Sequence, residues 1–200
     1  MKKIDVNFLE PSPQQLNILL GYYQARRYAD AEKLSLSITK KFPKHTFAWK
    51  VLGIVLKKTG RINEALFANQ KSVQLEPMNM ETNFNLGNTL QELGRLEEAE
   101  TYHRKAISIK PGYAEAHNNL GFTFQRIGRL EEAEVSYRKA IKLKPNYAEA
   151  HNNLSITLKE LGRLEEAEVS YRKAIKLKPD YAEAHNNLGN TLKELGRLEE

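Results

Sequence analysis

Five prolines recur every 34 residues along this 200-residue chain, and their period constrains the fold more than any single side chain does. They are Pro43, Pro77, Pro111, Pro145 and Pro179. A fixed period of this length is typical of a solenoid, in which each repeat packs mainly on its neighbours and the product is an extended surface. The sequence therefore predicts an array of one repeated unit.

The prolines define a numbering frame for the repeat. With each proline at position 32, the repeats span 12–45, 46–79, 80–113, 114–147 and 148–181, with a partial repeat at 182–200 and an N-terminal segment at 1–11. Glycine then falls at position 15 of every later repeat, as Gly60, Gly94, Gly128, Gly162 and Gly196, whereas the first repeat has Arg26 there. A recurring glycine at one position predicts the end of a helix.

Apolar residues on either side of this glycine follow helical spacing, both in residues 148–161 and between Leu164 and Leu177. Each repeat is therefore predicted to hold two helices, which we call helix A and helix B. The spacing of Asn146 with Glu149, and of Asp180 with Glu183, is that of a capping box and predicts where helix A begins.

Small residues occupy the positions where two helices must approach closely. Position 8 holds Gly53, Gly87, Gly121, Ser155 and Gly189, and position 20 holds Ala31, Ala65, Ala99, Ala133 and Ala167. A larger side chain there would push the helices beyond the usual spacing of about 8–10 Å. The pattern over residues 12–200 resembles the tetratricopeptide repeat, a family with a small residue at position 8, alanine at 20 and 27, an aromatic residue at 24 and proline at 32; Ser35 at 24 and Ile38 at 27 depart from it in the first repeat. The resemblance implies an all-α fold, an α-solenoid of antiparallel helix pairs that forms a right-handed superhelix.

The resemblance also implies that helix A lines a concave groove through positions 2, 5, 6, 9, 12 and 13. Position 6 is asparagine in five of six repeats: Asn17, Asn85, Asn119, Asn153 and Asn187. Polar Asn118, Asn152 and Asn186 at position 5, and apolar Phe122 and Ile156 at position 9, complete the candidate peptide-binding set. An asparagine amide both donates and accepts, which suits the backbone of an extended peptide.

This asparagine ladder is similar to the one that lines the groove of O-GlcNAc transferase. An alternative stays open, in which the asparagines were copied by duplication and only hydrogen-bond between neighbouring repeats. The chaperone-binding clamp of the family is absent, because the only lysine at position 5, Lys50, is followed by Ile54 at position 9.

The net charge of +6 arises in residues 12–79, which carry eleven basic residues against four acidic ones. Such a flank keeps a protein soluble or attracts an anionic partner. We do not expect nucleic acid, because no helix combines a basic face with interleaved aromatic residues. The chain has no cysteine and no long apolar run, so we expect no disulfide and no membrane partner, and we predict a cytoplasmic location.

His117, His151 and His185 recur at position 4, one repeat apart, which is too far for shared ligation of one metal ion. Trp49 stands at the same position, so packing is the favoured interpretation. No phosphate-binding loop, carboxylate pair or nucleophile triad appears. We therefore expect no catalytic residue, no metal and no cofactor within these residues.

The leading prediction is a protein-interaction scaffold that holds an extended peptide or protein segment in its groove. The alternative is the substrate-presenting arm of a larger enzyme, of glycosyltransferase, sulfotransferase or methyltransferase type, with its catalytic domain beyond residue 200. The sequence stops before the second helix of the last repeat, so Leu188, Leu192 and Leu195 are expected to lack a cover. That predicts self-association through residues 182–200.

Overall fold

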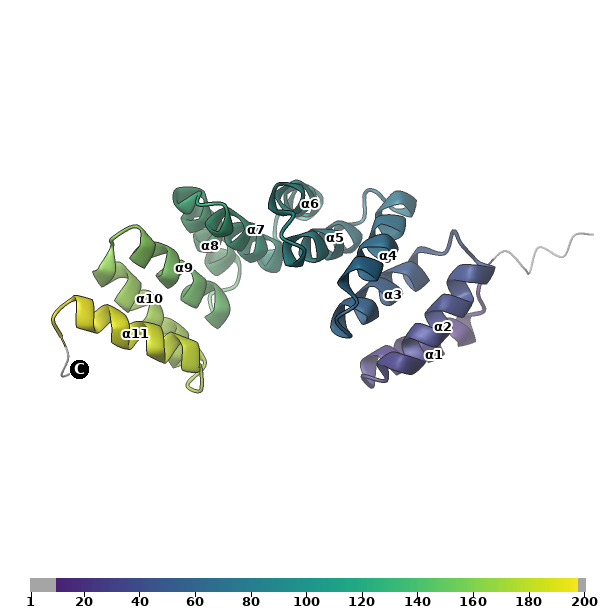
Figure 1. Ribbon diagram of the computed structural model, residues 1–200, viewed down its shortest axis with the longest axis horizontal. Coiled ribbons are helices and arrows are strands. Elements are labelled where there is room, and N and C mark those ends of the chain that lie inside the picture. Colours follow the sequence, from purple (N-terminus) through teal and green to yellow (C-terminus); the bar gives the residue numbers. More distant parts are fainter. Residues whose placement is uncertain (1–9, 198–200) are drawn as a thin grey trace, which may run out of the picture. The chain divides into compact units, whose positions relative to one another are not determined.

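The computed structural model describes residues 10–197, which hold eleven α-helices and no strand (Figure 1). Most of the predicted N-terminal segment, residues 1–9, and the last residues of the partial repeat, 198–200, lie outside the described residues. The helices form two compact units, one ending at Arg95 and the other beginning at Leu96. The prediction of an all-α helical-repeat fold is confirmed.

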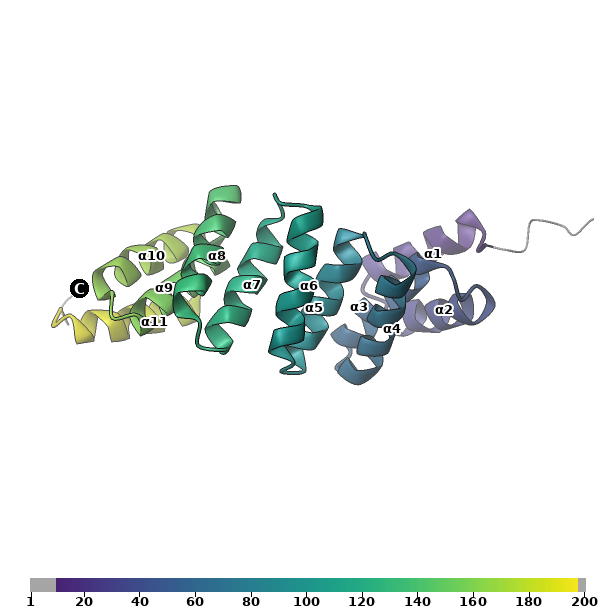
Figure 2. The same cartoon turned by 90° about the horizontal axis from the view of Figure 1, so that it is seen from above.

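In each unit consecutive helices pack side by side, joined by short turns (Figures 1 and 2). Unit 1 contains α1 (Pro13–Gln24), α2 (Tyr28–Lys41), α3 (Thr46–Lys58), α4 (Ile62–Leu75) and α5 (Met80–Glu92). Unit 2 contains α6 (Leu96–Ile109), α7 (Ala114–Arg126), α8 (Leu130–Leu143), α9 (Ala148–Glu160), α10 (Leu164–Leu177) and α11 (Ala182–Glu194). Odd-numbered helices are helix A of the repeat frame, and even-numbered helices are helix B. The boundary between the units falls inside the predicted repeat 80–113.

The recurring glycine does end helix A. All five glycines at position 15 have φ between +73° and +79°, the left-handed region that glycine adopts without steric cost. The next residue donates its backbone N–H to the carbonyl five residues back, as Arg61 does to Leu56 at 2.9 Å. This is the Schellman arrangement of a helix C-terminus. Arg26 takes the same conformation in the first repeat, with φ of +57°.

The predicted capping boxes at the start of helix A are wrong. Helices α9 and α11 begin two residues after Asn146 and Asp180, and their N-cap residues are Tyr147 and Tyr181, whose side chains make no cap hydrogen bond. The turn instead uses a different bond. The position-4 side chain donates to the carbonyl of the position-32 proline, as Trp49 Nε1 does to Pro43 at 2.8 Å.

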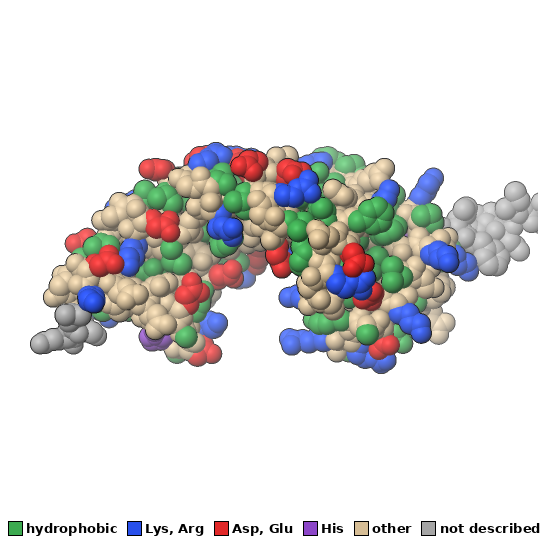
Figure 3. Space-filling model, viewed as in Figure 1, with side chains coloured by type: hydrophobic (Ala, Val, Ile, Leu, Met, Phe, Trp, Pro, Cys, Tyr) green, Lys and Arg blue, Asp and Glu red, His purple; other side chains and the backbone are tan. Residues whose placement is uncertain are grey.

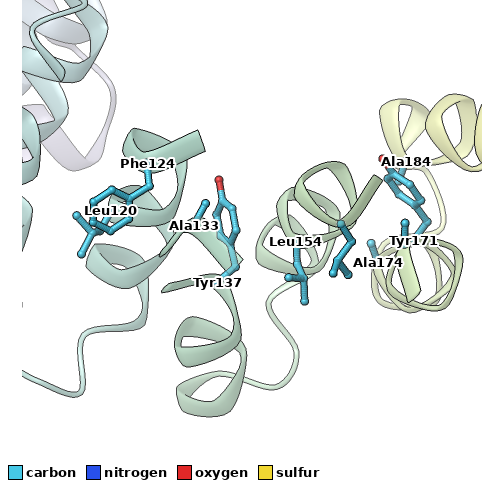
Figure 4. Close-up of a cluster of buried hydrophobic side chains, with 10 residues drawn as sticks. Leu120, Phe124, Ala133, Tyr137, Leu154, Tyr171, Ala174 and Ala184 are labelled. Atoms are coloured by element: carbon cyan, nitrogen blue, oxygen red, sulfur yellow. The ribbon is translucent and has the colours of Figure 1, made fainter. Parts of the chain in front are cut away.

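The core of unit 2 is a continuous cluster built on two buried tyrosines at position 24, Tyr137 and Tyr171 (Figure 4). The ring of Tyr137 lies against Gly121, where an added Cβ would approach the ring to 2.8 Å. Only a glycine therefore fits this contact without a shift of the ring. The small residue that the sequence places at position 8 is explained here by direct packing on the ring.

Unit 1 has two separate buried clusters instead of one. The first centres on Leu19 and Ile38, and the second on Leu52 and Leu56 with Trp49 packed against it. Position 24 holds Ser35 and Asn69 here, so no large ring joins the helices as in unit 2. The core of unit 1 is consequently less continuous.

A ladder of ion pairs joins successive B helices within each unit. The arginine at position 16 contacts the glutamate at position 21 of the preceding repeat, at 2.5–2.8 Å in four places: Arg61–Glu32, Arg129–Glu100, Arg163–Glu134 and Arg197–Glu168. Hydrogen bonds to glutamate raise the pKa of Arg163 further, and those from Arg163 lower the pKa of Glu166. The glutamates of these pairs are only 10–20% exposed and the arginines 38–43%, so the pairs are partly buried and hold neighbouring repeats in one orientation.

Helix α11 packs against α10 and α9, which changes the expectation for its leucines. Leu192 is only 7% exposed, and Leu188 packs on the core cluster of unit 2. The prediction that Leu192 lacks a cover is therefore wrong. Leu192 lies on α11, and the packing of α11 against α9 and α10 of the preceding repeat already buries it.

Candidate functional site

A hollow of about 410 Å³ opens on the helix-A side of unit 1. Its lining residues are Tyr23, Ile54, Lys57, Lys58, Asn69, Asn85, Asn88 and Glu92. All except Asn69 belong to helix A and stand at positions 6, 9, 12 or 13, the positions that the repeat resemblance implied. The hollow therefore forms where sequence reasoning expected a binding surface, although only Asn85 among the predicted site residues lines it.

The hollow carries amides and charges together. Lys57 pairs with Glu92 at 3.0 Å, whereas Lys58 beside it is exposed and has no carboxylate partner among the described residues. Asn85 is half-buried. The surface thus offers hydrogen-bond donors, acceptors and one positive charge that is not neutralised, a mixed chemistry suited to a polar chain such as a peptide backbone.

Asn69 forms the floor of this hollow from α4 and is only 1% exposed. Its Nδ2 donates to Thr89 Oγ1 at 2.9 Å, while its Oδ1 has no hydrogen-bond partner in the described structure and lies against Gly53. In two repeats of unit 2 the equivalent residue is a buried tyrosine, Tyr137 or Tyr171, and in the repeat directly after Asn69 it is the buried His103. The sequence signal for Asn69 was its departure from the aromatic residue at position 24, which sequence reasoning overlooked.

In unit 2 the structure brings three predicted asparagines together. Asn118 Nδ2 donates to Asn119 Oδ1, and Asn153 Nδ2 donates to Asn118 Oδ1 across neighbouring repeats, both at 3.2 Å. The second of these is an inter-repeat hydrogen bond of the kind that the alternative interpretation of the sequence expects, whereas the first lies within one repeat. Asn119 and Asn153 themselves are half-buried.

The position-5 asparagines are less accessible than the position-6 ones. Asn118 and Asn152 are each 1% exposed, and Asn152 Nδ2 reaches Glu183 at 3.5 Å in the next repeat. Asn186, the third of this set, is exposed on α11. Burial gives Asn118 and Asn152 a packing role whether or not a peptide binds.

The other predicted residues are spread over their units. Asn17 is exposed on α1, Asn187 is half-buried on α11, and Phe122 and Ile156 are half-buried against the core cluster of unit 2. A threonine at position 10 donates to the backbone carbonyl of the position-6 asparagine in four repeats, as Thr157 does to Asn153 at 3.1 Å. The threonine hydroxyl thus has its hydrogen-bond partner within its own helix.

The position-4 histidines have a structural partner. Nε2 of His117, His151 and His185 lies 2.9–3.1 Å from the carbonyl oxygen of the proline six residues earlier. Burial lowers the pKa of His117 and of His151 below the usual 6.5. A neutral ring that donates from Nε2 fits both observations. Among the described residues, no group of three or more metal-ligating side chains comes together.

Family models match the chain over most of its second half and part of its first. Tetratricopeptide repeat models match residues 79–146 and 136–169, and a TPR repeat model matches residues 157–196. The chain belongs to the tetratricopeptide repeat family. No curated protein matches its sequence.

Solved tetratricopeptide structures share the fold at low sequence identity. MamA is 22% identical, with 82% of this chain and 96% of that chain covered and a TM-score of 0.74. YrrB, described as a TPR protein with an unusual peptide-binding site, is 20% identical, with 88% and 91% covered and a TM-score of 0.73. TTC0263, a thermophilic TPR protein of Thermus thermophilus, is 24% identical, with 90% and 98% covered and a TM-score of 0.70. At such identities the likeness establishes the fold.

Lys and Arg outnumber Asp and Glu over the visible face of unit 1, while both signs mix over that of unit 2 (Figure 3). This agrees with the basic excess of residues 12–79. No helix among residues 10–197 is both long enough and apolar enough to cross a membrane.

Proposed function

We propose that this tetratricopeptide repeat protein is an interaction scaffold that holds an extended peptide or protein segment against helix A. The observation that carries the proposal is the hollow of unit 1, which seven helix-A residues at the predicted positions line. A neighbour of the same fold, YrrB, is described by its peptide-binding site. The fold and the hollow point to the same face.

The chemistry of the hollow favours backbone recognition. Asn85 and Asn88 present amides beside Ile54, so a peptide bond can be hydrogen-bonded while an apolar side chain packs on the isoleucine. Lys58 adds a positive charge at the rim. Main-chain contacts of this kind give affinity with little sequence preference, whereas the charged rim adds selectivity for acidic peptides.

In unit 2, the half-buried Asn119 and Asn153 are proposed to form a second helix-A contact surface. Phe122 and Ile156 supply apolar contacts. Self-association through residues 182–200 is not included in the proposal, because the burial of Leu192 removes part of its basis.

The test uses peptides selected on the full chain from a random display library, with affinities measured by calorimetry. Asn69→Tyr is expected to fill the hollow, as Tyr137 fills its counterpart, and Asn85→Ala removes an amide from its wall. Both should weaken binding roughly tenfold or more, the scale expected for residues at the centre of a binding site. Asn63→Ala, exposed on helix B of the same unit and outside the hollow, is the matched control and should bind normally.

Helix content measured by circular dichroism must be unchanged in all three variants, so that a loss of binding reports the site. Undiminished affinity of the selected peptides for well-folded Asn69→Tyr would reject the hollow as their binding site.

A further inference from the structure

A second surface, on the opposite helix set of unit 2, has the features of a docking site. It is a hollow of about 390 Å³ between α8, α9 and α10, which we call the α8–α10 groove. Its lining residues are Arg138, Ile141, Lys142, His151, Leu154, Val169, Ser170 and Lys173. Apart from His151 and Leu154, they come from helix B, so the groove is separate from the helix-A surface of the proposed function.

The floor and one wall of the groove are apolar. Leu154 is buried beneath it (Figure 4), Ile141 is half-buried, and Val169 is 69% exposed. A solvent-exposed valine side chain gains free energy when another protein covers it, because apolar surface leaves water. The groove thus holds an apolar anchor point that the chain itself leaves open.

The charge at the rim is positive, and the groove lining includes no acidic residue. Arg138 is already paired with Glu134 at 2.7 Å and with Glu166 at 3.2 Å. Lys142 and Lys173 have no carboxylate partner among residues 10–197. Two unpaired ammonium groups beside an exposed apolar wall are complementary to carboxylates that flank an apolar side chain.

The acidic residues nearby lie to one side. A neighbouring hollow of about 280 Å³ shares Arg138, Val169 and Ser170 with the groove and adds Glu165 and Glu166. Acidic groups of a partner are therefore favoured at the Lys142–Lys173 end and disfavoured at the other end. Because the two ends of the groove differ in charge, one orientation of the bound segment is favoured over the reverse.

Unit 1 presents the same chemistry at the same repeat positions. Phe67, the counterpart of Val169 at position 22, is 54% exposed and packs edge-on against Trp49, with ring centroids 5.9 Å apart. Lys71, the counterpart of Lys173 at position 26, lies 5.8 Å from the Phe67 ring. An exposed apolar residue beside a lysine thus recurs on helix B in both units.

We propose that the α8–α10 groove binds an acidic amphipathic segment of a partner protein, with an apolar side chain on Val169 and carboxylates beside Lys142 and Lys173. This function is additional to peptide binding by helix A. The two surfaces are built from different helices, so one can be removed by substitution while the other is kept.

The probe is a short fluorescein-labelled synthetic peptide with leucines flanked by glutamates, and its binding to the full chain is followed by fluorescence anisotropy. The double variant Lys142→Glu/Lys173→Glu should bind roughly tenfold more weakly, because attraction becomes repulsion. Val169→Asn should weaken binding roughly fivefold through lost apolar contact. Added salt should weaken binding to the unsubstituted chain.

Matched controls separate the groove from general charge and surface effects. Val135→Asn changes a residue that is 68% exposed at the same position one repeat earlier, and Lys193→Glu makes the same kind of charge change on helix A. Both should bind the probe normally. Thermal melts by circular dichroism should agree among all variants.

Three results would overturn the proposal. One is equal binding of a control peptide in which glutamine replaces each glutamate. Another is equal weakening in Lys193→Glu or Val135→Asn, or binding lost in Asn69→Tyr instead. The third is that the unsubstituted chain sediments as a dimer without peptide whereas the Lys142→Glu/Lys173→Glu variant sediments as a monomer. A second copy of the chain would then occupy the groove. Failure of the groove leaves the Asn69→Tyr test of the helix-A hollow unaffected.

Discussion

The two units follow one repeat pattern but differ at position 24. Unit 2 has His103, Tyr137 and Tyr171 there, all buried, and the two tyrosines lie in one continuous core, whereas unit 1 has Ser35 and Asn69. The hollow of about 410 Å³ lies where Asn69 replaces the ring. Where the tyrosine is present its ring fills the interior, and where Asn69 replaces it the structure has a polar hollow.

In both units a glycine at position 8 lets helix A approach helix B closely. Gly53 faces Asn69 and Gly121 faces Tyr137, and an added Cβ would approach them to 2.2 Å and 2.8 Å respectively. The close approach of the helices is therefore common to both, and only the side chain opposite the glycine differs. Tyr137 also makes a hydrogen bond within its own repeat, in which its hydroxyl donates to Gln125 Oε1 at 3.2 Å.

The comparison is tested most strongly by copying unit 1 into unit 2. Tyr137→Asn removes a fully buried ring from the centre of the core cluster. Loss of such a side chain should lower the free energy of unfolding by about 3 kcal/mol, because a cavity remains where the ring was. Urea unfolding followed by circular dichroism measures this change.

The Asn190→Ala variant is the control for that experiment, since Asn190 is an exposed residue of the same unit. It should change the free energy of unfolding by no more than about 0.5 kcal/mol. A loss below about 1 kcal/mol in Tyr137→Asn would mean that the neighbouring helices collapse onto the space. The position-24 ring would then not be what distinguishes the two units.

A second test uses two glycines at position 8 of one unit. Gly121→Ala should destabilise the protein by about 1–3 kcal/mol, because the new methyl group meets the Tyr137 ring. Gly189→Ala has no atom within 4 Å of the new Cβ and should instead stabilise α11 by up to about 1 kcal/mol through helix propensity. Urea midpoints that shift in the same direction for both variants would contradict the role of the ring contact.

Much of the fold followed from the sequence because the repeat makes each signal occur several times. The helix end at position 15 is confirmed, and the close approach at position 8 is confirmed at Gly53 and Gly121 but not at Gly189, since a glycine that recurs in phase marks a conformational or steric requirement. The capping boxes failed because the pattern of Asn146 with Glu149 also fits a turn in which the helix starts two residues later. A short motif without its context does not fix a helix boundary.

The candidate site was predicted only in part. The helix-A positions that line the hollow of unit 1 came from the family resemblance, whereas Asn69 belongs to helix B and was not foreseen. The burial of Asn118 and Asn152 also depends on how neighbouring repeats pack, which the order of residues within one repeat does not reveal. The α8–α10 groove combines residues of three helices, so the recurrence of an apolar residue at position 22 and a lysine at position 26 did not by itself reveal it.

The smallest expected effect concerns the turn between repeats, where the units again differ. Unit 2 uses His117 and His151 at position 4, while Asn83 of unit 1 makes the same bond from Nδ2 to the Pro77 carbonyl at 3.0 Å. Burial lowers the pKa of both histidines, so the unfolded chain takes up protons first as the pH falls through 6.5. Stability is therefore full above that pH, declines below it, and levels off under the pKa of the folded state.

The double variant His117→Asn/His151→Asn keeps a donor for each proline carbonyl but removes the titration. Its urea midpoint should match that of the unsubstituted chain near pH 8 and exceed it near pH 5, because the variant lacks the two histidines whose protonation favours the unfolded chain. The pKa of His45 is also lowered by burial, but His45 is present in both proteins, so the difference between the two profiles isolates the turns of unit 2. Parallel profiles from pH 8 to 5 would show that these turns hold a protonated ring as well as a neutral one, and that histidine and asparagine are equivalent at position 4.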